Sequence, residues 1–226
     1  MSLTTIGIIA EGPADQFVLR NILYAFGLEK NQIQFVRPEL NEDETDKTNS
    51  NEKRFGSWTN VKKECESATP FDDFLNNQLA GDKLIIIHLD SDVCNQYGVQ
   101  KTSNPRTAQD FTDFRQKIMD KINEWLDNKY VNQLFYAICI KQMDAWVLTL
   151  LDNKGNKDTG SITNPKDILE DTKAYKKVKK ETQKTRIIYG ELSDNFSYKK
   201  KLKEAIKYNQ SLKDFVNSLE SYFEAL

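Results

Sequence analysis

The chain has 226 residues, of which 38% are hydrophobic and 29% are charged, a composition typical of a globular protein with one sizeable α/β domain or a domain and a small appendage. No apolar run approaches the roughly 20 residues that span a bilayer, and no signal-peptide pattern opens the chain, so we expect a cytoplasmic protein without membrane contact. Three cysteines without CxxC spacing fit reduced thiols. The single histidine, His88, argues against a Ser-His-Asp triad or a His-rich zinc site, and we expect it in the core or supporting a functional group.

Strand and helix signals alternate through the first 151 residues. Pro13 stands at the first position of a predicted helix and Gly27 just past its end. Such alternation favours an α/β fold with a mostly parallel sheet and right-handed crossovers. The predicted polar loops are 39–54 and 95–106. The predicted strands are 4–10, 32–38, 83–89 and 134–140, and the predicted helices are 13–26, 59–79 with a break at Thr69-Pro70, 108–129 and 143–151.

Beyond Asp152 the pattern predicts a loop and three or four helices, with "TRIIY" (185–189) left unassigned. Up to Leu150 the chain carries 16 basic against 22 acidic residues, and from Leu151 onward 16 against 12. This basic excess suits an anionic polymer, although a solvated helical face is the more common explanation of lysine runs. The candidate contacts to a nucleic-acid backbone are Lys176, Lys177, Lys179, Lys180, Lys199, Lys200 and Lys201. The last predicted helix has one apolar face, formed by Leu212, Phe215, Val216, Leu219, Tyr222 and Phe223. Such a face usually packs in a core, and a dimer contact or a lid is the alternative.

Carboxylates follow three of the predicted strands: Glu11 the first, Asp90 and Asp92 the third, and Asp144 the fourth. Functional groups collect at the carboxyl ends of parallel strands, and neighbouring strands lie about 4.8 Å apart. Asp90 and Asp92 point the same way if the backbone there is extended. Clustered carboxylates raise one another's pKa unless a cation neutralises them, and Mg²⁺ or Mn²⁺ prefers such oxygen ligands. Taken singly, Glu11, Asp15 and Asp144 are also ordinary acids at helix N-termini.

Together, "IIAEGPADQFVLRNIL" (8–23) and "LIIIHLDSDV" (84–93) resemble the Toprim domain, the metal-binding module of topoisomerases, bacterial primases, recombination-mediator proteins and overcoming-lysogenisation-defect nucleases. The resemblance implies a Toprim-like four-stranded sheet over 4–150, with an insertion at about 39–79, and leaves 151–226 as a helical, lysine-rich extension packed on it. It implies that Glu11 acts as an acid/base group or as a metal ligand and that Asp90 and Asp92 coordinate Mg²⁺. "KQMDAWVL" (141–148) is similar to an acid-aromatic motif of small stand-alone Toprim-like proteins, some linked with RNA cleavage or phage defence.

The resulting hypothesis is a Mg²⁺- or Mn²⁺-dependent hydrolase of RNA or DNA phosphodiesters, in a defence or mobile-element context. Asp144 is a candidate for a second metal site, and Lys141 for opposing charge on the phosphate. The main alternative is a Toprim-like metal-binding module that docks a partner protein or a second copy without hydrolysis. A glycosyltransferase with an Asp-x-Asp motif is a weaker alternative, and a haloacid-dehalogenase-type phosphatase weaker still, because Cys94 stands where that motif has Thr or Val. The chain is too short to add the nucleophile or primase domain of a topoisomerase or primase.

Overall fold

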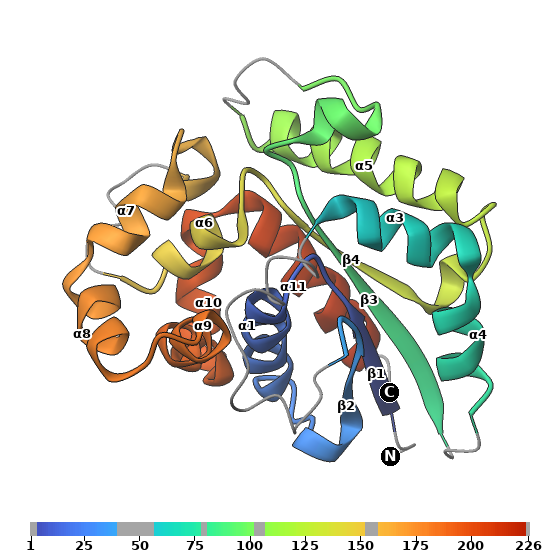
Figure 1. Ribbon diagram of the computed structural model, residues 1–226, viewed down its shortest axis with the longest axis horizontal. Coiled ribbons are helices and arrows are strands. Elements are labelled where there is room, and N and C mark those ends of the chain that lie inside the picture. Colours follow the sequence, from blue (N-terminus) through green and yellow to red (C-terminus); the bar gives the residue numbers. More distant parts are fainter. Residues whose placement is uncertain (1–3, 40–56, 78–80, 102–106, 152–157, 225–226) are drawn as a thin grey trace.

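A computed structural model describes residues 4–39, 57–77, 81–101, 107–151 and 158–224. Its centre is a four-stranded, all-parallel sheet in the order β2-β1-β3-β4, with helices on both faces (Figure 1). This confirms the predicted α/β fold with its helical C-terminal region. Within the described residues, no helix has the length and apolarity needed to cross a membrane. The strands are β1 (Thr4–Ile9), β2 (Ile33–Arg37), β3 (Asp82–Asp90) and β4 (Leu134–Cys139).

The strand register brings the carboxyl ends of three strands to one level. β1 pairs with β3 from Thr4–Asp82 to Ile9–Ile87, and β3 pairs with β4 as far as Asp90–Cys139. The chain after β1 therefore leaves the sheet beside the last residues of β3. Because the sheet is parallel, the loops that carry Glu11, Asp90 and Lys141 all emerge at this edge.

The first face of the sheet is covered by α1 and by the helices of the C-terminal third (Figure 1). Ile6, Ile8 and Ile86 of the strands share one apolar cluster with Trp146 and Phe215. The C-terminal helices thus complete the main core. The helices on this side are α1 (Pro13–Tyr24), α6 (Met143–Leu148), α7 (Pro165–Asp171), α8 (Lys173–Glu181), α9 (Thr185–Leu192), α10 (Lys199–Ala205) and α11 (Gln210–Phe223).

The second face is covered by α3 (Trp58–Ser67), α4 (Thr69–Leu75) and α5 (Ala108–Trp125), which pack on Ile85 and Ile87. Residues 57–77, placed by the sequence within an insertion, therefore bury part of the sheet. Residues 40–56, which contain most of the predicted 39–54 loop, lie outside the described residues. Short 3₁₀ turns connect the main elements: η1 (Lys30–Gln32), η2 (Cys94–Tyr97), η3 (Val131–Gln133), η4 (Thr159–Ser161), η5 (Asp194–Ser197) and η6 (Ile206–Tyr208).

Two details of the predicted elements were wrong, and a third was displaced by one residue. α5 ends at Trp125 instead of 129, because Asp127 and Asn128 adopt positive φ values of 51° and 57°. The break between α3 and α4 lies at Ala68, whose φ is also 57°. The C-terminal third holds five α-helices within the described residues, since the unassigned "TRIIY" starts α9. Its isoleucines favour strand locally, but burial of the α9 side chains in the core beside α1 selects a helix.

We predict that Phe215→Ala lowers the free energy of unfolding by about 3–5 kcal/mol. The Phe215 ring is fully buried and stacks on Trp146 with ring centroids 5.5 Å apart. Urea denaturation measures the loss, and Tyr198→Ala is the matched control, because Tyr198 lies in the same helical region but is 58% exposed. Equal stability of the two variants would contradict a core shared between the sheet and the C-terminal helices.

Candidate metal centre

Glu11 is tied directly to the end of β3. Its Oε1 accepts a hydrogen bond of 2.7 Å from the backbone N–H of Asp90. Glu11 can reach that amide because the chain continues alongside β2 after β1 ends. The N–H of Ala10 bonds to the carbonyl of Arg37, the last residue of β2, at 2.9 Å. The predicted meeting of the first two carboxylate-bearing loops is therefore present in the structure.

Asp90, the last residue of β3, holds the start of α6. Its Oδ1 accepts the N–H of Met143 at 3.0 Å, and its carbonyl accepts the hydroxyl of Tyr97 at 3.0 Å. The Asp90 side chain is 19% exposed. The start of α6 therefore fixes the Asp90 carboxylate and Tyr97 fixes its backbone carbonyl, while the side chain stays partly exposed to solvent.

Asp92 reaches the same edge by a different route from the one expected. β3 ends at Asp90, and Asp92 lies in the following turn, so the alternation of an extended strand does not set its direction. Its N–H donates to the Lys141 carbonyl at 3.1 Å, and its Oδ2 accepts from the Gln142 side chain at 2.9 Å. The turn, together with the chain after β4, positions this acid.

Each of the three carboxylates keeps one oxygen available. Hydrogen bonds to described residues engage Oε1 of Glu11, Oδ1 of Asp90 and Oδ2 of Asp92. The second oxygen of each makes no hydrogen bond within the described part of the chain. Carboxylate oxygens are the ligands that a hard divalent cation prefers, although those of Glu11, Asp90 and Asp92 do not all lie within 4.8 Å of one another.

Burial makes negative charge costly at this edge. It raises the pKa of Glu11 to about 8, with a further increase from the nearby charge of Asp90. Burial also raises the pKa of Asp90 well above its usual value, and the charges of Asp92 and Asp144 add to the effect. A divalent cation at this position would favour the ionised carboxylates and reverse these shifts.

His88 lies beneath the carboxylates, with no exposed surface. Its Nε2 is 3.3 Å from Asp90 Oδ1, and its Nδ1 is 3.6 Å from Asp15 Oδ2, although neither ring nitrogen makes a well-aligned hydrogen bond to a described residue. Asp15 also accepts the Gly12 N–H at 2.9 Å, the helix-start role expected for it. Burial raises the pKa of Asp15 to about 7, and the charge of His88 opposes that increase.

A second donor set shares Asp90. Single ligand atoms of His88, Asp90 and Cys139 lie within 4.8 Å of one another, a spacing that, among the described residues, no other set of three His, Cys, Asp or Glu side chains attains. The set of Glu11, Asp90 and Asp92 is thus more widely spaced. Cys139 is fully buried, and burial raises the pKa of its thiol well above the usual value. Nitrogen and sulfur donors suit zinc-like ions better than Mg²⁺.

Asp144 and Lys141 lie beside this centre with other partners. Asp144 is only 6% exposed, its Oδ1 accepts the hydroxyl of Tyr189 on α9, and burial raises its pKa. Lys141 has a φ of 75°, and its backbone N–H bonds to Ser91 Oγ at 2.8 Å. Burial lowers the Lys141 pKa, and the charge of Asp92 opposes this change. The structure therefore brings Lys141 near Asp92, whereas the carboxyl group of Asp144 is directed towards α9.

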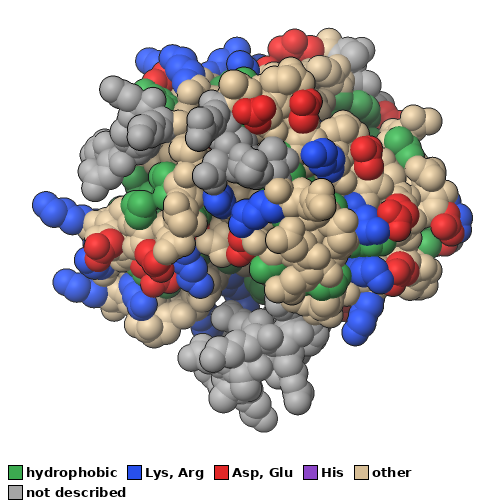
Figure 2. All heavy atoms as spheres, turned by 90° about the horizontal axis from the view of Figure 1, so that it is seen from above, with side chains coloured by type: hydrophobic (Ala, Val, Ile, Leu, Met, Phe, Trp, Pro, Cys, Tyr) green, Lys and Arg blue, Asp and Glu red, His purple; other side chains and the backbone are tan. Residues whose placement is uncertain are grey.

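The lysines predicted to contact nucleic acid lie on α8 and α10, and all seven are exposed. Lys176 forms an ion pair with Asp171 at 2.7 Å. On the face seen in Figure 2, basic and acidic side chains are interspersed and the basic ones do not gather into one patch. The two lysine runs therefore remain candidate contacts without forming a single basic surface in this view.

Several residues of the centre were missed in the sequence. The two-residue spacing of His88 and Asp90 in a strand could have placed them on one face. Gln142 and Tyr97 carried no comparable signal, since their contacts with Asp92 and Asp90 depend on how loops fold over the sheet edge. Tyr189 belongs to the segment left unassigned.

Scans against protein-family models, curated proteins and solved structures found no match.

We predict that the metal-free protein loses stability as the pH rises. Glu11 and Asp15 have pKa values raised to about 8 and about 7, so the folded state binds more protons than the unfolded state between roughly pH 4.5 and 8. The free energy of unfolding in EDTA should fall across this window, with a Glu11 contribution of roughly 1–3 kcal/mol after allowance for partial exposure.

Urea denaturation of the parent and of Glu11→Gln between pH 5 and 9 measures this contribution. Glutamine keeps an oxygen for the Asp90 amide but cannot ionise, so the variant should show a shallower decline. Parallel profiles for the two proteins would contradict the raised pKa of Glu11.

Proposed function

We propose that the chain is a divalent-cation-dependent phosphodiester hydrolase acting on RNA or DNA. The observation that supports this most is the convergence of Glu11, Asp90 and Asp92 at one sheet edge, each with one carboxylate oxygen not hydrogen-bonded to a described residue. The Toprim resemblance assigns the same three residues and stays a prediction, as do its defence or mobile-element context and the identity of the ion as Mg²⁺ or Mn²⁺.

A bound divalent cation would activate water and reduce the charge on the phosphate. Glu11 bonds to the Asp90 amide at the same edge and would act as a ligand or as the acid/base group, the two roles that the resemblance implies for it. Lys141 lies close enough to Asp92 for their charges to interact and would oppose charge developing on the phosphate. Asp90 orients the start of α6 through the Met143 amide.

Metal binding without hydrolysis is the second candidate. The spacing of the side chains favours this candidate. Ligand atoms of His88, Asp90 and Cys139 all lie within 4.8 Å of one another, whereas those of Glu11, Asp90 and Asp92 do not. A zinc-like ion held by the buried set would serve stability or partner docking instead of chemistry at the surface.

We predict that the parent binds Mg²⁺ or Mn²⁺ saturably in calorimetry and that Asp90→Asn/Asp92→Asn abolishes this binding. The same double variant should lower Mn²⁺-dependent cleavage of single-stranded or duplex RNA or DNA by at least roughly 100-fold. Asp113→Asn/Asp120→Asn is the matched control, because it removes two exposed acids of α5 and should change neither quantity. Metal binding with no cleavage of any of these substrates would favour the second candidate, and absence of Mg²⁺ and Mn²⁺ binding at millimolar metal would exclude the hydrolase.

Cys139→Ala separates the two donor sets. It removes the thiol from the buried set and leaves the oxygen ligands in place. Mg²⁺ binding should persist in this variant if Glu11, Asp90 and Asp92 hold the ion. Loss of Mg²⁺ binding from a variant that keeps the parent circular dichroism spectrum would contradict the oxygen site.

A further inference from the structure

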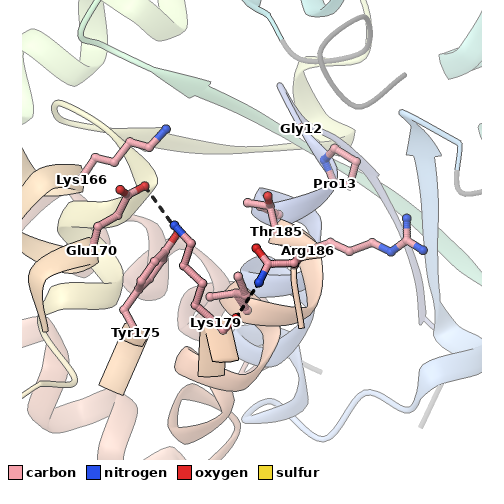
Figure 3. A pocket seen from close by; sticks show the side chains of 11 residues that line it. Gly12, Pro13, Lys166, Glu170, Tyr175, Lys179, Thr185 and Arg186 are labelled. Carbon is pink, nitrogen blue, oxygen red and sulfur yellow. Dashed lines mark hydrogen bonds between the residues drawn. The ribbon is translucent and has the colours of Figure 1, made fainter. Parts of the chain in front are cut away.

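A pocket of about 580 Å³ lies between the start of α1 and the helices α7, α8 and α9. Its volume falls in the range of small-ligand sites. Figure 3 shows Lys166, Glu170 and Lys179 on one side of the pocket and Gly12, Pro13 and Thr185 on the other. The remaining lining residues are Ala14, Tyr175, Gln183, Arg186 and Ile188.

The pocket has an excess of positive charge. Lys166 of α7 and Lys179 of α8 face one carboxylate, that of Glu170, whereas Arg186 of α9 lines the pocket with its guanidinium extending away from the two lysines (Figure 3). Lys166 and Lys179 are exposed, and no carboxylate of a described residue lies within ion-pair distance of either ammonium. Lys179 lies over the Tyr175 ring, with its Nζ 5.4 Å from the centroid, and this contact orients the ammonium.

The pocket also adjoins the carboxylate centre. Gly12 lines it and follows Glu11 directly in the chain. Lys166 and Glu170 are near enough to Asp144 for their charges to act on its pKa. A chain molecule with one group in the pocket would therefore have its next units beside Glu11 and Asp144.

We propose that this pocket binds a terminal phosphate of the nucleic-acid strand whose scissile bond lies at the carboxylate centre. This inference rests on the proposed hydrolase function. A phosphomonoester carries a charge of about −1.5 to −2 near neutral pH, and the ammonium groups of Lys166 and Lys179, which form no ion pair with a described residue, offer it two positive charges. Lysine ammonium groups bind such a group as point charges. An internal diester carries a single negative charge, so two lysine ammonium groups favour a terminal phosphomonoester over it.

The test is fluorescence anisotropy with an internally labelled single strand, in DNA and RNA versions, bearing a 5′-phosphate, a 3′-phosphate or only hydroxyl ends. Binding is measured in EDTA, so that it does not depend on the metal site. The parent should bind one phosphorylated form roughly tenfold more tightly than the hydroxyl form. Lys166→Gln/Lys179→Gln should remove this preference. Lys199→Gln/Lys201→Gln, which removes the same charge from α10, should weaken all forms alike and keep the preference.

Equal binding of all three strands by the parent, or a preference that survives Lys166→Gln/Lys179→Gln, would overturn the proposal. Competition by a nucleoside monophosphate at the affinity of the phosphorylated strand would also overturn it, because the ligand would then be a free mononucleotide. End preference without cleavage in Mg²⁺ or Mn²⁺ would retain the pocket and reject the hydrolase. Cleavage without end preference would retain the hydrolase and reject the phosphate pocket.

Discussion

The crowding of carboxyl groups at one edge of a parallel sheet is the constraint on which the rest of this structure depends. Burial raises the pKa of Glu11, Asp15, Asp90 and Asp144, so charge in this neighbourhood must be removed by protons or balanced by cations. His88 lies between two of these acids, and backbone amides bond to Glu11, Asp15 and Asp90 in directions fixed by the sheet and by the starts of α1 and α6. Carboxyl groups with pKa values shifted in this way cluster at functional sites.

The C-terminal helices belong to this arrangement. The hydroxyl of Tyr189 on α9 bonds to Asp144, and Asn21 on α1 donates to the Gly190 carbonyl at 2.8 Å and to Ser193 Oγ at 2.9 Å. Trp146, in the helix that Asp90 caps, stacks on Phe215 of α11. Because the same helices close the main core and flank the start of α1, the edge with the carboxylates and the pocket with the lysines are held by one set of contacts. Ligand binding at either place would therefore be linked to the packing of the C-terminal third.

The sequence predicted what the parallel topology alone determines. Apolar strands alternating with helices predicted the sheet, and the carboxyl ends of neighbouring parallel strands bring Glu11 close to Asp90. The path of Asp92 could not be predicted, because β3 ends two residues earlier and a turn bonded to the Lys141 carbonyl sets its direction. The partner of Asp144 was hidden for another reason: the isoleucines of "TRIIY" favour strand locally, and only burial beside α1 makes the segment a helix that presents Tyr189. Contacts made by side chains across loops have no periodic signal in a sequence.

The central claim is that Glu11, Asp90 and Asp92 share one divalent cation. Anomalous diffraction from crystals grown with Mn²⁺ tests it most directly, since the ion is located independently of any activity. We expect one anomalous peak bounded by the second oxygens of these three carboxylates, about 2.1–2.3 Å from those that bind the ion. A peak enclosed by His88, Asp90 and Cys139, or no peak at this edge of the sheet at saturating Mn²⁺, would contradict it.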